Sequence, residues 1–241
     1  MKQTGFFHHI GSFLLLAATV LLVITTISAP VVNKISMLKV NLYDQASGDR
    51  NPTITFGTFG WCVTDALSDG GDVCSGKHIG YDPISVVENN VDNVDFSHLS
   101  TDTSEGLTRV MILHPIAAGL SFIAFLLALG AGVVGSLLAS LTSLLTFIVT
   151  LVVLITDFVC FAIIRNEVNN AASNNGNASR AEWGAATWTM LVAAICNLLA
   201  TVIVFFTCCS ARLHRRRESR RAAKDVPEGY GTPVQRRRRW W

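Results

Sequence analysis

The feature that most constrains this chain is a long uncharged stretch in its middle. In residues 110–164 the only acidic or basic side chains are His114 and Asp157. As a single helix this stretch would be about 80 Å long, whereas about 20 residues suffice to cross the roughly 30 Å hydrocarbon core of a bilayer. The stretch must therefore fold back on itself, and we predict two membrane spans, at 111–135 and 141–164.

Two further apolar runs, at 7–29 and 183–209, lie on either side of the central stretch. Pro30 ends the first run, which is longer than the roughly 7–15 apolar residues usual in a signal peptide. We therefore predict a retained span, with a cleaved signal peptide as the alternative. Trp183 and Trp188 stand at the start of the last run, where their rings favour the membrane interface. The four spans together predict a membrane-embedded all-α four-helix bundle.

Small residues recur at every fourth position in and after the second span. A face of small side chains lets helices approach closely, so we expect these residues to pack within the bundle, with self-association as the alternative. The turn between the second and third spans is expected near Gly135 and Ser136, where small residues cluster. The recurring residues are Ala124, Ala128, Gly132 and Ser136.

The distribution of charge predicts on which side of the membrane each segment lies. Half of the residues are hydrophobic, 15% are charged and the net charge is +2. Segment 30–109 contains eleven acidic and five basic residues, whereas segment 210–241 contains three acidic and eleven basic residues. Because basic residues next to a span stay cytoplasmic, both termini are expected in the cytosol, with 30–109 and 165–182 outside. The basic residues that follow the last span are Arg212, Arg215, Arg216, Arg217, Arg220 and Arg221.

Three further surface features follow from this orientation. The basic residues of the tail are expected to bind anionic lipids of the inner leaflet, at about 1 kcal/mol for each residue near the surface. Nucleic-acid binding is not expected of a tail held at a membrane. Cys208 and Cys209 lie at the inner boundary and suit S-palmitoylation, with ordinary buried thiols as the alternative. Asn177 begins an N-glycosylation sequon in the second outer loop.

Two of the six cysteines, Cys62 and Cys74, lie in the polar segment 30–109. An isolated pair in a polar loop of a membrane protein indicates a disulfide, which persists only on an oxidising side. Closing a loop of this size stabilises a fold by about 3 kcal/mol in the chain-entropy model. A metal site is the alternative, but His78 is the one histidine nearby, and no metal is expected.

Alternating apolar residues in the same segment predict β-strands. Strands are expected at 31–32, 37–42 and 53–63, and the Asp-Gly-Gly-Asp sequence at 69–72 indicates a turn. Residues 82–105 are polar, acidic and weakly patterned, so we expect a solvated, mobile stretch there. A partner-binding or cation-attracting surface is the alternative.

An acidic side chain inside a span is costly unless it is paired or hydrated, so we expect Asp157 to face the bundle interior. One hypothesis is a structural hydrogen bond to a Thr or Ser of a neighbouring helix, and the alternative is a proton- or cation-responsive site. His114 lies at a similar depth and is the partner to test. The chain contains none of the common enzyme motifs, and neither catalysis nor a cofactor is expected.

A recognisable set of residues follows the first span. It comprises Gly57, Phe59, Gly60, Trp61, Cys62, Cys74, Gly80 and Tyr81. This set resembles the fungal PalI/Sur family of claudin-like four-span proteins, whose pattern is Gly, two apolar residues, Gly, any residue and Cys, with a second Cys further on. Thr58 departs from the first apolar position, and Ile-Gly-Tyr-Asp at 79–82 favours the PalI branch.

The resemblance covers about residues 5–212 and implies a non-enzymatic protein of the plasma membrane. PalI-type members assist an ambient-pH-sensing receptor complex, which implies a seven-span membrane protein as the partner. Sur-type members organise static membrane domains linked to eisosomes and cell-wall integrity, and this role is the alternative. A cation-responsive channel or transporter subunit, suggested by Asp157 and His114, is a further alternative. By analogy with claudins, the outer segment would be a small antiparallel sheet on the helix bundle, stapled by Cys62 and Cys74.

Overall fold

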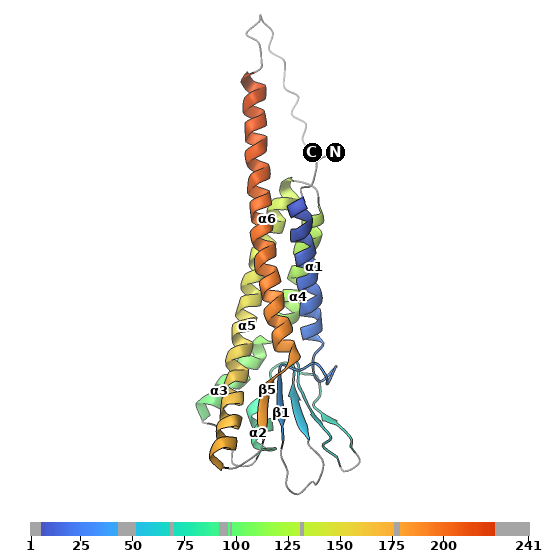
Figure 1. Cartoon of the computed structure of the whole chain (residues 1–241), viewed down its shortest axis with the longest axis vertical. Helices are drawn as coiled ribbons and strands as arrows, with labels where there is room; N and C mark the ends of the chain where they lie inside the picture. The colour runs from blue at the N-terminus through green and yellow to red at the C-terminus, as the bar shows by residue number, and fades with distance from the viewer. Residues whose placement is uncertain are drawn as a thin grey trace, which may run out of the picture.

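The computed structural model shows a bundle of long helices that carries a small sheet at one end (Figure 1). It describes residues 6–42, 52–67, 70–91, 96, 98–130, 133–175 and 179–224. In this part of the chain, four helices are long and apolar enough to cross a membrane. They are α1 (Phe6–Thr26), α4 (Leu113–Leu129), α5 (Val133–Asn175) and α6 (Ala185–Lys224). Each of them packs extensively against two neighbours, in the order α1, α4, α5, α6 around the bundle.

The break between the second and third spans lies earlier than the sequence predicted. Helix α4 ends at Leu129, and the backbone N–H of Gly130 donates to the carbonyls of Leu126 and Leu127. Helix α5 begins at Val133, so Gly135 lies inside it and is not part of the turn. A Cβ on Gly135 would lie 3.1 Å from the Gly130 carbonyl oxygen, so the absence of a side chain allows the two helix ends to approach closely. The predicted bounds 111–135 and 141–164 were therefore wrong at this turn.

Among the described residues, the sheet is antiparallel and contains five short strands. They are β1 (Leu38–Asn41), β2 (Thr53–Phe56), β3 (Trp61–Thr64), β4 (Val73–Cys74) and β5 (Arg180–Trp183), in the spatial order β4-β3-β2-β1-β5. The predicted strand 53–63 is two strands, joined by a turn in which the Gly57 N–H donates to the Gly60 carbonyl at 2.9 Å. Residues 31–32 form no strand and lie in a turn after α1.

Helix α5 is much longer than a membrane span requires. Its 43 residues correspond to about 65 Å, which is roughly twice the thickness of the hydrocarbon core. The segment 165–182, predicted as the second outer loop, is largely regular structure, because α5 extends to Asn175 and β5 follows. The Asn169 side chain accepts from the Ala181 N–H at 3.0 Å and donates to the Ala181 carbonyl at 3.2 Å, which fixes β5 to α5.

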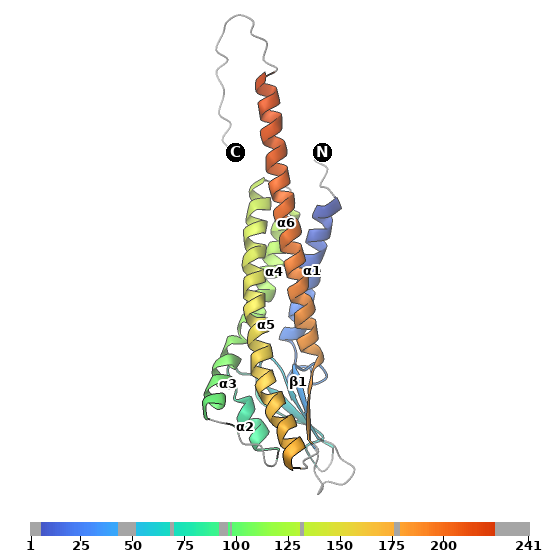
Figure 2. The same cartoon turned by 60° about the vertical axis from the view of Figure 1, so that its left-hand side comes forward.

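Two helices occupy the described part of the segment that was expected to be mobile. They are α2 (Pro83–Glu88) and α3 (His98–Val110), and Figure 2 shows both beside the lower half of α5. Asp82 caps α2 by accepting from the N–H groups of Ile84 and Ser85. Ile84 and Val87 are fully buried, so burial of apolar surface holds α2 in place despite the polar composition of the segment.

One core joins the sheet to the bundle. The inner face of β1 and β2 contributes fully buried side chains, among them Leu38 and Phe56. Phe161 and Ile164 of α5 pack against that face, and the rings of Phe56 and Phe161 lie 6.4 Å apart. At the other end, α6 continues as one helix to Lys224 (Figure 1), so no break in secondary structure separates the last span from residues 210–224.

Candidate functional site

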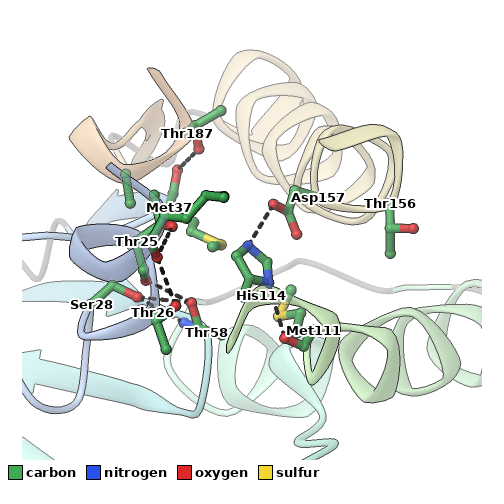
Figure 3. A network of polar contacts seen from close by, with 12 residues as sticks. Thr25, Thr26, Ser28, Met37, Thr58, Met111, His114, Thr156, Asp157 and Thr187 are labelled. Atoms are coloured by element: carbon green, nitrogen blue, oxygen red, sulfur yellow. Dashed lines mark hydrogen bonds and ion pairs between the residues drawn. The ribbon is translucent and has the colours of Figure 1, made fainter. Parts of the chain in front are cut away.

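The most distinctive polar contact in the molecule joins His114 to Asp157 where the bundle meets the sheet (Figure 3). His114 stands in the first turn of α4, and Asp157 stands on the inner face of α5. His114 Nε2 and Asp157 Oδ2 are 3.1 Å apart, and the two side chains are 0% and 2% exposed. Asp157 faces the bundle, as expected, and its partner is the histidine of similar depth, not a Thr or Ser.

The geometry determines how many protons this pair holds. His114 Nδ1 lies 3.0 Å from the carbonyl oxygen of Met111, which can only accept, so Nδ1 carries a proton. The contact between Nε2 and Oδ2 then requires one proton, placed on either atom. Imidazolium with carboxylate and imidazole with carboxylic acid are both neutral overall, so the pair is buried without net charge. Among the described residues, Asp157 Oδ1 has no hydrogen-bond partner, so this oxygen is the open position of the pair.

Tyr81 belongs to the set of residues that resembles the PalI/Sur family (the family motif) and connects it to the region of His114 and Asp157. Its hydroxyl donates to the Gly57 carbonyl at 2.8 Å, and its own carbonyl accepts from Thr108 Oγ1 at 2.7 Å. Burial raises the pKa of Tyr81 well above its ordinary value of 10.0, and the nearby acidic groups of Cys160 and Asp157 raise it further. Tyr81 is therefore a neutral donor that ties the β2–β3 turn to the end of α3.

The motif glycines stand where a side chain would collide with a neighbour. A Cβ on Gly57 would overlap the backbone of Ala29, and a Cβ on Gly80 would lie 2.6 Å from Arg109 Cγ. Gly60 and Gly80 also have positive φ angles, of 155° and 71°, which favour glycine. Gly57 thus allows the turn after β2 to sit directly on the segment that follows α1, and Gly80 allows the chain to pass close to α3.

The two motif cysteines form the predicted disulfide. Cys62 of β3 and Cys74 of β4 are directly opposite in the register of the two strands and are covalently joined. Beside them, the Trp61 N–H donates to Ser75 Oγ at 2.9 Å, and the Ser75 N–H donates to the Trp61 carbonyl at 2.9 Å. Phe59 accepts from the His78 N–H at 3.2 Å, so the motif residues gather in one small unit at the β4 edge of the sheet.

Hydrogen bonds attach this unit and the sheet to the ends of the membrane helices (Figure 3). The Thr58 hydroxyl donates to the carbonyl of Thr25 at 2.9 Å, and the Thr58 N–H donates to Ser28 Oγ at 3.0 Å. Thr187 in the first turn of α6 donates to the Met37 carbonyl at 2.7 Å. Thr58, which departs from the apolar residue of the family pattern, therefore has a local reason to be polar.

A second polar layer, which the sequence analysis missed, lies in the middle of the bundle. Asn197 of α6 is fully buried, accepts from Ser121 Oγ of α4 at 3.3 Å and donates to Thr150 Oγ1 of α5 at 3.1 Å. Thr19 Oγ1 of α1 lies 3.1 Å from Ser121 Oγ, so all four helices contribute a side chain. The signal was present, because Asn197 is the single Asn in the apolar run 183–209.

The comparisons with known proteins agree with the motif. The model of the SUR7/PalI family matches residues 7–215, which include the sheet and most of each of the four long helices. This chain belongs to the SUR7/PalI family. The resemblance inferred from the sequence is thereby confirmed, and the four apolar helices make this member a multi-pass membrane protein.

Two curated relatives carry names that describe a function. Over 120 residues, half of this chain, the sequence is 32% identical to the pH-response regulator protein palI/RIM9 of Emericella nidulans. Over 118 residues, 49% of this chain, it is 35% identical to the pH-response regulator protein palI/prr-5 of Neurospora crassa. The matched segment makes up 18% and 15% of these two relatives, so the chain spans less than a fifth of either.

The small residues predicted to recur at every fourth position lie partly inside the bundle of this SUR7/PalI protein. Ala124 and Ala128 are buried against α1, α5 and α6, so this part of the row of small residues (the small stripe) packs inside the bundle. Ser136 lies on α5, beyond the break after α4, so the predicted stripe does not continue along one helix. Gly132 and Asn177 lie outside the described residues.

The inner end of α6 contains the other predicted residues. Cys208 is a buried free thiol. For Cys209 and for the basic residues after it the structure gives a helical backbone. These residues are Arg212, Arg215, Arg216, Arg217, Arg220 and Arg221. Across the described ranges, no group of three or more His, Cys, Asp or Glu side chains is placed to hold a metal ion.

Proposed function

We propose that this chain is a non-enzymatic accessory protein of the fungal pH response, which acts at the plasma membrane beside a larger membrane partner. The match to the SUR7/PalI family over residues 7–215 carries this proposal, because relatives that share half of the chain are named pH-response regulators. A seven-span pH-sensing receptor is the partner that we propose, with the claudin-like outer sheet and the bundle as the binding surface.

The orientation that suits this role places the sheet outside the cell and both termini in the cytosol. A disulfide between β3 and β4 persists on an oxidising side, and the arginine-rich end of α6 belongs on the cytoplasmic side. There the basic residues would contact anionic lipids, and palmitoylation of Cys209 would add a second anchor, whereas the thiol of Cys208 is buried.

The decisive experiment is deletion of the gene in its own fungus, with growth and gene expression measured after a shift to alkaline pH. We expect loss of the pH response, and reduced delivery of the seven-span partner to the cell surface. Re-expression of the wild-type chain should restore both, whereas a variant with both Cys62→Ser and Cys74→Ser should restore neither fully. A deletion strain with a normal pH response would contradict the proposal.

The alternative role as an organiser of membrane domains predicts a different result. In that role, a fluorescent fusion of the chain would form stable patches in the plasma membrane of cells whose pH response is intact. Because Ala124 and Ala128 are buried inside the bundle, such assembly would need a surface other than the small stripe. Uniform, freely diffusing fluorescence would exclude this role.

A further inference from the structure

An arginine stands at the point where α5 leaves its apolar stretch on the sheet side. Arg165 is the first charged residue of α5 after Asp157, and it follows the apolar residues 158–164. Trp183 on β5 stands just before α6, whose apolar span begins at Ala185. Figure 1 shows α5 and β5 side by side at this level. Trp side chains favour the depth of the lipid headgroups, and Trp183 with the neighbouring Arg165 marks the end of the apolar stretch on the sheet side.

The arginine is held in place by the seam between α5 and β5. The guanidinium carbon of Arg165 lies 5.9 Å from the centroid of the Trp183 ring. Phe158, two turns earlier on α5, supports the same ring, with the two ring centroids 5.2 Å apart. Asn169, one turn further along, binds the backbone of Ala181 through two hydrogen bonds. The guanidinium is therefore positioned before any ligand arrives, which lowers the entropic cost of binding.

The protein does not neutralise this cation. Arg165 Nε is buried, yet it has no hydrogen-bond partner among the described residues. In the same part of the chain Arg165 forms no ion pair with an acidic residue, although the exposed Glu167 and Glu182 are close in sequence to Arg165 and Trp183. A guanidinium stays charged at every physiological pH and offers five donors in one plane. Among the described residues, the guanidinium of Arg165 therefore has no anionic acceptor.

We propose that Arg165, held over Trp183, binds the phosphate of a phospholipid headgroup in the leaflet on the sheet side. Phosphate oxygens accept two parallel N–H bonds from a guanidinium, which gives both strength and geometric selectivity. Lipid phosphate is present at this depth wherever α5 and α6 cross a bilayer, so the ligand needs no access route through the protein. The site does not depend on the role in the pH response.

The experiment uses the full chain purified in a mild detergent, with bound lipid counted by native mass spectrometry. A short-chain phosphatidylcholine is titrated, beside a diacylglycerol that has the same acyl chains but lacks phosphate. For Arg165→Gln we expect the first phosphatidylcholine to bind roughly tenfold more weakly, because charge-assisted hydrogen bonds are lost. Arg165→Lys should be intermediate, since it keeps the charge without the planar donors. Arg180→Gln, an exposed cation at the far end of β5, is the matched control and should bind as the wild type does.

Three results would overturn the proposal. In the first, the wild type and Arg165→Gln bind phosphatidylcholine with equal affinity. In the second, the wild type binds the diacylglycerol as tightly as it binds phosphatidylcholine. In the third, inorganic phosphate at an equal concentration displaces the bound lipid. The last result would indicate a site for free anions. Thermal unfolding shows whether Arg165→Gln is folded. If it is not, the binding of phosphatidylcholine and of the diacylglycerol is compared for the wild type and Arg165→Lys, and equal binding of the two lipids by the wild type overturns the proposal.

Discussion

At the scale of single residues, the pairing of His114 with Asp157 shows how a carboxyl group is tolerated inside a membrane bundle. The Met111 carbonyl fixes the proton on Nδ1, and the remaining ring nitrogen shares one proton with the carboxyl group. The pair is neutral as a unit, but neither member is satisfied without the other. The pair lies near Tyr81, at the end of the bundle next to the sheet, where the membrane helices meet the outer domain.

The pair therefore predicts strongly coupled substitutions. Asp157→Leu or His114→Leu alone should lower the free energy of unfolding by about 3 kcal/mol, because each leaves a buried polar partner unpaired. Asp157→Asn should cost less, since an amide still hydrogen bonds to the imidazole. The Leu/Leu double variant should be closer to the wild type than either single variant. Reversible denaturation of the purified chain measures these differences, and additive effects of the two Leu substitutions would contradict the pairing.

At the scale of elements, each long helix is more than a membrane span. Helix α5 contains a membrane span and also forms a wall of the core beneath the sheet, through Phe161 and Ile164. Helix α6 carries Asn197, which hydrogen bonds to both α4 and α5 in the middle of the bundle. Because lipid tails offer no apolar driving force between helices, close packing and such hydrogen bonds hold the bundle together.

Asn197→Ala tests this central layer. We expect a loss of about 1 kcal/mol in the free energy of unfolding, the usual size for hydrogen bonds between membrane helices. Leu198→Ala is the matched control, because Leu198 is the next residue on α6 and its side chain is exposed on the lipid-facing surface. Both variants are compared with the wild type by denaturant titration in the same detergent. An equal effect of the two substitutions would show that the hydrogen bonds contribute little.

At the scale of the whole molecule, the start of α1 and the far end of α6 lie at one end of the bundle, and the sheet lies at the other (Figure 1). The sheet is attached to the bundle at α1 through Thr58, at α6 through Thr187 and at α5 through Asn169. Three attachments on three helices make the outer domain and the bundle one body. A force or ligand that acts on the sheet is therefore transmitted directly to the helices.

The sidedness can be tested in intact cells. An epitope fused after Trp241 should become accessible to antibody only after permeabilisation. Cys62 and Cys74 should react with a membrane-impermeant alkylating reagent in intact cells, but only after treatment with an impermeant reductant, because they form a disulfide. The buried Cys160 is the internal control and should stay unlabelled. Access of the antibody to the epitope in intact cells would refute the orientation.

Some expectations from the sequence failed because distant segments decided the outcome. The strand β5 and residues 165–175 of α5 come from a stretch that was expected to be a loop. They form because β1 pairs with β5 and because Val168 packs into the core beneath the sheet. Likewise α2 and α3 have a polar composition, and a few residues such as Ile84 anchor them in the core. Local patterns contain no information about such partners.

The amino-acid sequence by itself determined the four spans, the cysteine pair and the family motif, because each depends on local quantities. These quantities are the length of an uncharged run, the number of cysteines in a polar segment and the spacing of glycines. The tertiary structure alone decided that His114 is the partner of Asp157, that Asn197 links the helices and that Arg165 stacks on Trp183 without an anion. These contacts join residues far apart in the chain, so they depend on how the helices rotate and pack, which no local pattern specifies.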